Sequence, residues 1–247
     1  MTYCCGLLVR EGLVMIADTR TNAGLDNIST FRKLHTFEQS DNRVLMIATA
    51  GNLSVTQNVI SHVTAGLENP DTGEFESLAT VSSMFAAAQL VGRAVRKVRD
   101  TLGASSNEVN FDVTLLLGGQ LKGRRMRLFM IYSAGNFIEA TEDTPYLQIG
   151  EHKYGKPVLD RAVNFDSEIY DSLKLGLVSM DSTMRSNLGV GLPIDIALLR
   201  RDAPDLEIKH RIDHIDPYFH DLRDRWSVAL RKAHLNIPRP PYGNMRA

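Results

Sequence analysis

The first eighteen residues constrain this chain most, because they predict a hairpin of two β-strands joined by a tight turn. Residues 2–10 and 12–18 are rich in apolar and β-branched residues, and Glu11-Gly12 between them is typical of a hairpin connection. The second strand of a hairpin runs back toward the start of the first. We therefore expect Asp18 to lie beside Thr2.

A loop and a further short strand bring a lysine to the same place. Residues 21–31 contain Thr, Asn, Gly, Asp and Ser, which favours a loop, and residues 32–38 read as a strand that carries Lys33. Removal of Met1 leaves Thr2 with a free amine that can act as base for its own hydroxyl. An adjacent lysine favours the alkoxide, and a carboxylate holds that lysine. Thr2, Asp18 and Lys33 are the predicted catalytic residues.

A bland interpretation exists, since Thr after an initiator Met is common and a strand that ends in Asp-Thr-Arg can simply turn. The combined pattern is more specific. It comprises Thr2, Gly6, Ala17-Asp18-Thr19-Arg20, Ala23-Gly24 and Arg32-Lys33. It resembles the proteasome β-subunit and HslV superfamily of N-terminal nucleophile hydrolases. Within that superfamily the phrase DTRTNAGLDNISTFRK is most similar to the bacterial proteasome-like Anbu family, and the likeness covers nearly the whole chain.

Composition excludes several other classes. The 247 residues are 43% hydrophobic and 23% charged with a net charge of −1, which suits a large core and argues against a basic nucleic-acid surface. No apolar run reaches the length of a membrane span, and no signal peptide is recognisable. Cys4 and Cys5 are adjacent, so they exclude a disulfide framework and are expected to be buried. We expect a cytoplasmic protein, in a bacterium, without nucleic-acid or membrane partners.

Two strand-rich blocks separated by helical segments predict a layered α+β domain. The resemblance implies a four-layer αββα sandwich with two antiparallel sheets. We expect one domain over residues 1–247, with a Pro-rich tail at 235–247. The helices are predicted at 53–67, 78–100, 156–163, 167–185 and 217–233, and further strands at 44–50, 112–119, 126–133, 136–140, 145–149, 190–199 and 206–211.

The strand that ends at Ala50 turns at Gly51 into a helix, whose first amides lack partners within the helix. This can be a plain strand-to-helix turn or an oxyanion hole. The resemblance implies the second, with the Gly51 amide as donor. It also implies that Thr21, Thr49 and Leu53 line the pocket beside the scissile bond.

Supporting residues follow from the same resemblance. Related chains have a Ser where this one has Glu151, so we expect a carboxylate near the Thr2 amine, or else an exposed loop residue. Asp181 and Ser186 match the residues that support the nucleophile's amine, although a polar helix end would look the same. A structural cation near residues 181–187 is conceivable, while no cofactor and no side-chain metal site are expected; the histidines at 210, 214 and 220 read as scattered surface residues.

The resemblance implies a threonine-dependent hydrolase of peptide or other amide bonds that assembles with its own copies into a ring or an open helical stack. Removal of Met1 by a methionine aminopeptidase is expected to suffice for activation. Two alternatives stay open: a catalytically quiet structural subunit, and an amidohydrolase that acts on a small or unusual peptide. The sequence does not indicate whether an ATPase partner delivers substrate.

Overall fold

The computed structural model describes residues 1–22, 28–39, 43–70, 72–103 and 112–244. They form two compact units, Met1–His214 and Ile215–Ala247. The expectation of one domain with a tail at 235–247 stays a prediction, and the two units are described separately below.

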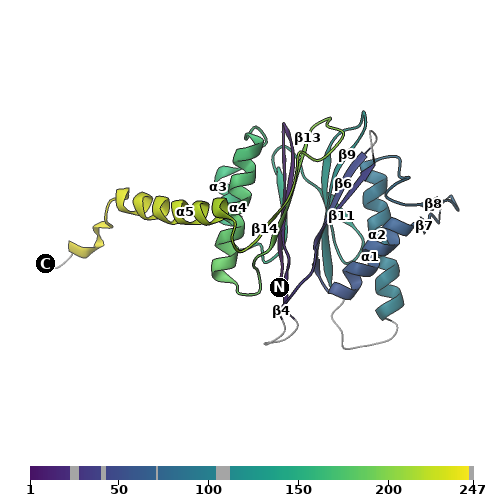
Figure 1. Ribbon diagram of the computed structural model, residues 1–247, viewed down its shortest axis with the longest axis horizontal. Coiled ribbons are helices and arrows are strands. Elements are labelled where there is room, and N and C mark those ends of the chain that lie inside the picture. The colour runs from purple at the N-terminus through teal and green to yellow at the C-terminus, as the bar shows by residue number, and fades with distance from the viewer. Residues whose placement is uncertain (23–27, 40–42, 71, 104–111, 245–247) are drawn as a thin grey trace. The chain divides into compact units, whose positions relative to one another are not determined.

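The first unit is built on two antiparallel five-stranded sheets that face each other (Figure 1). The first sheet has the order β12 (Tyr146–Gly150), β1 (Tyr3–Val9), β2 (Gly12–Asp18), β13 (Ile194–Arg200) and β14 (Ile208–Ile212). The second has the order β11 (Phe137–Glu139), β10 (Arg127–Ile131), β9 (Val113–Leu121), β6 (Arg43–Gly51) and β5 (Leu34–Gln39).

Helices cover the outer face of each sheet (Figure 1). Helices α3 (Lys156–Ala162) and α4 (Ile169–Ser186) lie on the first sheet, while α1 (Leu53–Ala65) and α2 (Met84–Gly103) lie on the second. Two small pairs, β3 (Arg20–Asn22) with β4 (Ile28–Thr30) and β7 (Leu67–Glu68) with β8 (Phe75–Glu76), complete this unit. The predicted α+β class and the αββα layers are confirmed.

The burial of β1 and β2 shows why the first sheet lies between the second sheet and a helical layer. All seven residues of β1 and all seven of β2 are buried, because one face of this hairpin meets the second sheet and the other meets α4. Both cysteines are buried and unpaired, as expected. Gly176 lets α4 approach closely, since a Cβ there would lie 2.6 Å from the Cδ1 of Ile16.

Several element boundaries differ from the sequence predictions. The predicted loop 21–31 contains the β3–β4 pair, and its residues 23–27 lie outside the described part. The second helix begins at Met84 instead of residue 78, because the Ser83 hydroxyl accepts the amide hydrogen of Ala86 and so caps the helix there. β13 begins at Ile194, just after the cis peptide bond between Leu192 and Pro193.

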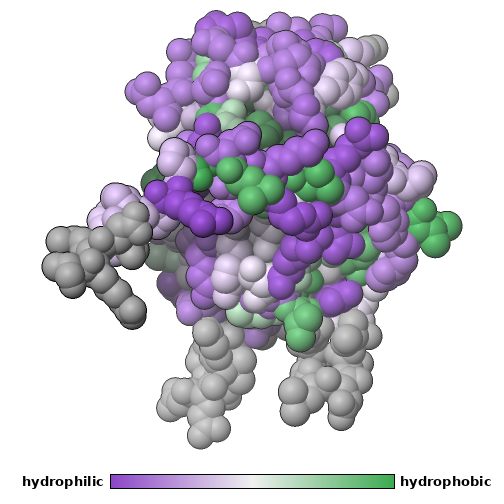
Figure 2. Space-filling model, turned by 90° about the vertical axis from the view of Figure 1, so that its left-hand side faces the viewer, coloured by the Kyte–Doolittle hydropathy of each residue, from purple (hydrophilic) through white to green (hydrophobic). Residues whose placement is uncertain are grey.

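The second unit contains α5 (Pro217–Asn236) and the 3₁₀ turn Pro241–Asn244. Asp216 caps α5 by accepting the amide hydrogen of Phe219, and Pro217 occupies the first helical turn. Helix α5 extends three residues beyond the predicted end at 233 and so takes in the start of the Pro-rich segment 235–247, which also contains the 3₁₀ turn. Among the described residues, no helix combines the length and apolarity needed to cross a membrane. The face in Figure 2 is mostly hydrophilic, with smaller hydrophobic areas.

Candidate functional site

The predicted catalytic residues meet at one end of the first sheet. Asp18 ends β2, and its Oδ1 accepts hydrogen bonds from the amide of Tyr3, at 3.0 Å, and from the Nζ of Lys33, at 2.9 Å. Lys33 directly precedes β5 and also donates to the carbonyl oxygen of Arg20, at 2.6 Å. Because Tyr3 is the residue after Thr2, the hairpin places the Asp18–Lys33 pair beside the predicted nucleophile.

The ion pair is almost completely shielded from water, with exposed fractions of 0% for Asp18 and 4% for Lys33. Burial raises the pKa of Asp18 above its ordinary value, and the neighbouring Lys33 and the hydrogen bond from Tyr3 lower it in part. A second amide, that of Gly191, faces the other carboxylate oxygen at 3.4 Å. The carboxylate therefore has donors from three parts of the chain.

Met1 lies at the same place. Its carbonyl oxygen is 3.5 Å from the Lys33 Nζ, and its side chain is 61% exposed. A Cβ on Gly189 would lie 2.7 Å from the Cβ of Met1, so this glycine lets the loop pass close to the N-terminus. The Thr2 carbonyl accepts the amide hydrogen of Glu151 at 2.8 Å, which fixes the backbone of Thr2 against β12.

Gly51, the predicted oxyanion donor, is the last residue of β6 and has a φ of 110°. A side chain is excluded there twice over, by this left-handed φ and by the Asp112 carbonyl oxygen, which would lie 2.2 Å from a Cβ. The next residue, Asn52, caps α1 by accepting the amide hydrogen of Val55 at 3.2 Å. Gly51 thus stands at a strand-to-helix turn, as the sequence predicted.

The three predicted pocket residues come from three elements, with Thr21 in β3, Thr49 in β6 and Leu53 at the start of α1. Thr49 is buried, and its amide donates to the carbonyl oxygen of Lys33 at 3.0 Å. Leu53 is half-buried at the start of α1. The Thr21 hydroxyl oxygen is buried and has no hydrogen-bond partner among the described residues. A substrate group could satisfy that oxygen.

Of the three predicted supporting residues, Glu151 and Asp181 have side chains bonded to other described residues and Ser186 does not. Glu151 accepts a hydrogen bond from the Asn187 side chain at 2.9 Å, and the Nζ of Lys153 lies 3.7 Å away. Asp181 is buried and pairs with Arg185 at 3.0 Å. Ser186 is exposed at the end of α4, and no side-chain hydrogen bond ties it to another described residue. The structure therefore does not bring Ser186 into the bonded group around Asp18.

Two contributors escaped the sequence analysis, namely Asn187 as the partner of Glu151 and Gly191 as a donor to Asp18. Each contact joins residues 36 or 173 positions apart, and no local pattern signals it. Residues 181–186 belong to helix α4, and the described residues hold no cluster of three His, Cys, Asp or Glu side chains suited to a metal. A cation held by backbone carbonyls near 181–187 stays a prediction.

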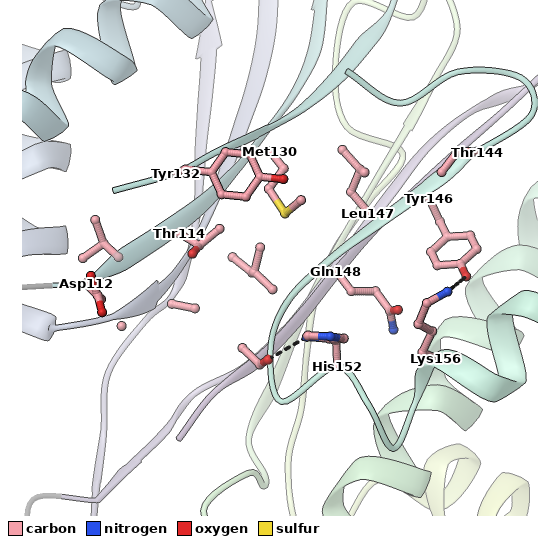
Figure 3. A pocket seen from close by; sticks show the side chains of 15 residues that line it. Asp112, Thr114, Met130, Tyr132, Thr144, Tyr146, Leu147, Gln148, His152 and Lys156 are labelled. Carbon is pink, nitrogen blue, oxygen red and sulfur yellow. Dashed lines mark hydrogen bonds between the residues drawn. The ribbon is translucent and has the colours of Figure 1, made fainter. Parts of the chain in front are cut away.

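Gly51 also lines a cavity of about 570 Å³. Figure 3 labels ten of its lining residues, among them Tyr132, Leu147 and His152. Its walls come from the end of β6, from β9 and β10, from β12 and from the start of α3. Met130, Leu147 and Tyr132 give it apolar surface, while His152 and Lys156 are basic residues in its lining. Both Gly51 and Gly150 line it, and a Cβ on Gly150 would lie 2.0 Å from the Thr2 carbonyl oxygen. The cavity thus lies next to a residue that packs on the backbone of Thr2, although Thr2 itself is not among its lining residues.

Comparison with solved structures gives a family. Anbu (ancestral beta-subunit) from Yersinia bercovieri is 44% identical, with a TM-score of 0.89 over 98% of this chain and 100% of that one. Anbu from Hyphomicrobium sp. strain MC1 is 46% identical, with a TM-score of 0.88 over 96% of this chain and 99% of that one.

A structure described as the helical assembly of the Anbu complex from Pseudomonas aeruginosa is 40% identical, with a TM-score of 0.89 over 98% of this chain and 99% of that one. No protein-family model and no curated protein matches the sequence. The identity and the coverage show that this chain belongs to the Anbu family, within the proteasome-like N-terminal nucleophile hydrolases.

Proposed function

We propose that this chain is a threonine-dependent hydrolase of peptide or other amide bonds, with Thr2 as nucleophile once Met1 is removed. The observation that carries the proposal is the buried Lys33–Asp18 pair, with 2.9 Å between Nζ and Oδ1. The amide of Tyr3, the residue after Thr2, donates a hydrogen bond to the same Asp18 oxygen. A buried ion pair contributes little net stability, because desolvation offsets the attraction. Its position beside an N-terminal threonine favours a role in catalysis.

In the proposed reaction the Thr2 Oγ attacks a carbonyl carbon, and its proton passes to the free Thr2 amine. The Lys33 ammonium stabilises the developing alkoxide, and Asp18 holds Lys33. The Gly51 amide donates to the oxyanion, and Thr21, Thr49 and Leu53 contact the substrate before the scissile bond. The C–N bond breaks, the leaving amine takes a proton, and water then hydrolyses the acyl-enzyme.

Removal of Met1 is an obligatory step in this proposal, because only then does Thr2 carry a free amine. With Met1 in place, its carbonyl oxygen lies 3.5 Å from the Lys33 Nζ and occupies space beside the nucleophile. A chain that keeps Met1 has a blocked Thr2 amine and is inactive in this proposal. No cofactor takes part in the proposed reaction.

We also propose that copies of this chain assemble into an open helical stack or a ring. The support is the relative from Pseudomonas aeruginosa, whose structure is described as a helical assembly. Sedimentation of the full chain over a concentration series tests this, and a monomer at every concentration contradicts it.

Intact-protein mass spectrometry with a peptide epoxyketone, a reagent that needs an N-terminal threonine amine and hydroxyl, tests the hydrolase. We expect one adduct per Met-free chain, no adduct on Thr2→Ala and an unchanged adduct on the control Thr64→Ala, an exposed threonine of α1. A Met-free chain that stays unlabelled favours the quiet subunit. Labelling without cleavage of any peptide in a broad panel favours the hydrolase of small or unusual peptides.

A further inference from the structure

The cavity beside Gly51 lies along an unpaired sheet edge. Strand β12 is the outermost strand of the first sheet and pairs with β1 alone among the described strands. All five of its residues line the cavity. An edge strand presents a row of free N–H and C=O groups to which another extended chain can pair.

The register with β1 shows which groups face this edge. Glu151 donates to the Thr2 carbonyl and Leu8 donates to that of Pro145, so the odd-numbered residues of this strand pair with β1. In an antiparallel pair the alternate residues direct their N–H and C=O groups the other way. The backbone groups of Tyr146 and Gln148 therefore point away from β1, along the side where the cavity lies.

The position of the cavity assigns it to one half of a substrate. The predicted pocket residues before the scissile bond are Thr21 of β3, Thr49 of β6 and Leu53 of α1. None of these three residues lines the cavity, which Gly51 does line together with residues of β9, β10, β12 and the start of α3. Figure 3 shows Leu147 and Gln148 of β12 on one side of it and Thr114 and Met130 of β9 and β10 on the other. A peptide whose scissile carbonyl is at Gly51 would thus extend its leaving segment along β12.

The part of the cavity that runs along β12 is called the groove below. Its end beside Tyr146, away from Gly150, carries the positive charge of Lys156. The Lys156 Nζ contacts the Tyr146 hydroxyl at 3.2 Å and the Asp160 carboxylate at 2.6 Å, and the lysine side chain is 48% exposed. An ammonium group has three N–H donors, so these contacts leave one for a ligand. From Gly150 to Tyr146 the strand advances four residues, or about 13 Å. A carboxylate on the third or fourth leaving residue would reach Lys156.

We propose that the groove along β12 binds the leaving segment of a peptide substrate as an added strand, and that Lys156 selects a carboxylate three or four residues beyond the scissile bond. The carboxylate can be an acidic side chain or the free C-terminus of the peptide. This proposal rests on the proposed hydrolase for its kinetic consequences, but binding of the leaving segment is independent of turnover.

The kinetic experiment compares peptides that share one sequence before the scissile bond and carry leaving segments of one to five residues. Each segment is made with a free C-terminus, with an amide, and with an amide plus a glutamate at the third or fourth position. We expect a carboxylate there to raise kcat/KM about tenfold, as a charge-assisted hydrogen bond does. The glutamate and free-acid peptides show which source of the carboxylate is preferred.

Two variants and one modification sharpen this test. Lys156→Gln removes the preference, while Arg161→Gln, an exposed basic residue on the same helix, retains it. N-methylation of successive leaving-segment amides lowers kcat/KM about fivefold at alternate positions, since only every second amide faces β12. The groove proposal is overturned if kcat/KM does not change with the length of the leaving segment, or if Lys156→Gln keeps the carboxylate preference. It is also overturned if N-methylation lowers kcat/KM equally at every position.

Fluorescence anisotropy with a labelled four-residue leaving segment and the Thr2→Ala chain separates this inference from the hydrolase. If binding to the Thr2→Ala chain weakens about tenfold when Lys156→Gln is added, the groove is supported. If in addition the Met-free chain with Thr2 intact neither cleaves peptides nor takes the epoxyketone adduct, the hydrolase is refuted while the groove stands. Cleavage without such binding refutes the groove and supports the hydrolase. The amides of Tyr146 and Gln148 face the open edge, so slow hydrogen exchange at these two positions in peptide-free assembled protein overturns the proposal in favour of a second copy covering β12.

Discussion

Replacing Lys33 by Met gives the sharpest test of how the site is held together. The substitution keeps most of the side-chain volume but removes the cation 2.9 Å from Asp18. Asp18 is 0% exposed, so water cannot solvate the carboxylate in place of the ammonium. The amides of Tyr3 and Gly191 stay as donors, at 3.0 Å and 3.4 Å, and offset only part of the loss.

Leaving one member of a buried ion pair without its partner costs about 3–5 kcal/mol. In a domain of this size that loss lowers Tm by roughly 2–4 °C per kcal/mol, or by about 6–20 °C in total. The double variant Asp18→Asn with Lys33→Met carries no buried charge at this place. We expect it to recover most of the lost stability, and the coupling between the two substitutions to exceed about 1 kcal/mol.

The pH dependence has a definite sign. Burial already raises the pKa of Asp18, and loss of Lys33 removes the largest opposing contribution, so the pKa of Asp18 rises further in Lys33→Met. Between the unfolded and the folded pKa, the folded chain then binds more protons than the unfolded chain, and stability falls as pH rises. The variant is therefore closest to the parent in mild acid and loses most above the raised pKa.

Urea denaturation followed by circular dichroism, at fixed protein concentration and several pH values between about 4.5 and 8, measures both effects. The control is Lys97→Met, which removes an exposed lysine of α2. The reasoning is refuted if Lys33→Met is as stable as the control at neutral pH. It is also refuted if the loss is the same at every pH, or if the double variant is no more stable than the single one.

Three further outcomes are expected. Glu151→Ser shifts the pH optimum of hydrolysis without abolishing turnover, because it removes a carboxylate, held by Asn187, from the residue whose amide donates to the Thr2 carbonyl; an unchanged pH–rate profile removes Glu151 from the site. Gly51→Ala lowers the free energy of unfolding, measured by urea denaturation, by at least about 1 kcal/mol more than Gly73→Ala. Both glycines have positive φ, but of the two only Gly51 has backbone within 4 Å of a Cβ; equal losses contradict this. Asn187→Ala lowers kcat/KM about fivefold, because it removes the hydrogen bond that holds the Glu151 carboxylate. If the same substitution has an equal effect in a Glu151→Ser background, Asn187 does not act through Glu151.

Local patterns predicted the parts of this fold that local physics determines. The N-terminal hairpin, the strand-to-helix turn at Gly51 and the helix with apolar residues at Val55, Val59 and Val63 follow from residues close in sequence. The hairpin turn itself lies at Arg10-Glu11, one residue before the predicted Glu11-Gly12, because Gly12 of β2 already pairs with Val9 of β1. The start of α2 was misplaced by six residues, because the apolar pattern continues through Leu78 and Val81 while Ser83 supplies the cap. Periodicity reports burial, and burial continues beyond the end of a helix.

The site was predictable only as far as the family resemblance and the hairpin reached. Thr2 directly precedes β1, Asp18 ends β2 and Lys33 directly precedes β5, so their meeting follows from the topology of one N-terminal segment. The bond from Asn187 to Glu151 and that from Gly191 to Asp18 depend on how the loop after α4 packs against the N-terminus. The spacing of these residues in the sequence does not predict that packing.

These late contacts bear on how the site forms. Asp18 would be a buried charge with one backbone donor if only β1 and β2 were in place, a state that costs several kcal/mol. Lys33 arrives with β5 from the second sheet, and Gly191 arrives with the loop between α4 and β13. The ionised carboxylate is therefore stable only when both sheets and the loop after α4 have assembled around it. A nucleophile that depends on this carboxylate becomes active only in the completed fold, so we expect substitutions in the 187–191 loop to reduce labelling of Thr2 although none of these residues takes part in the chemistry.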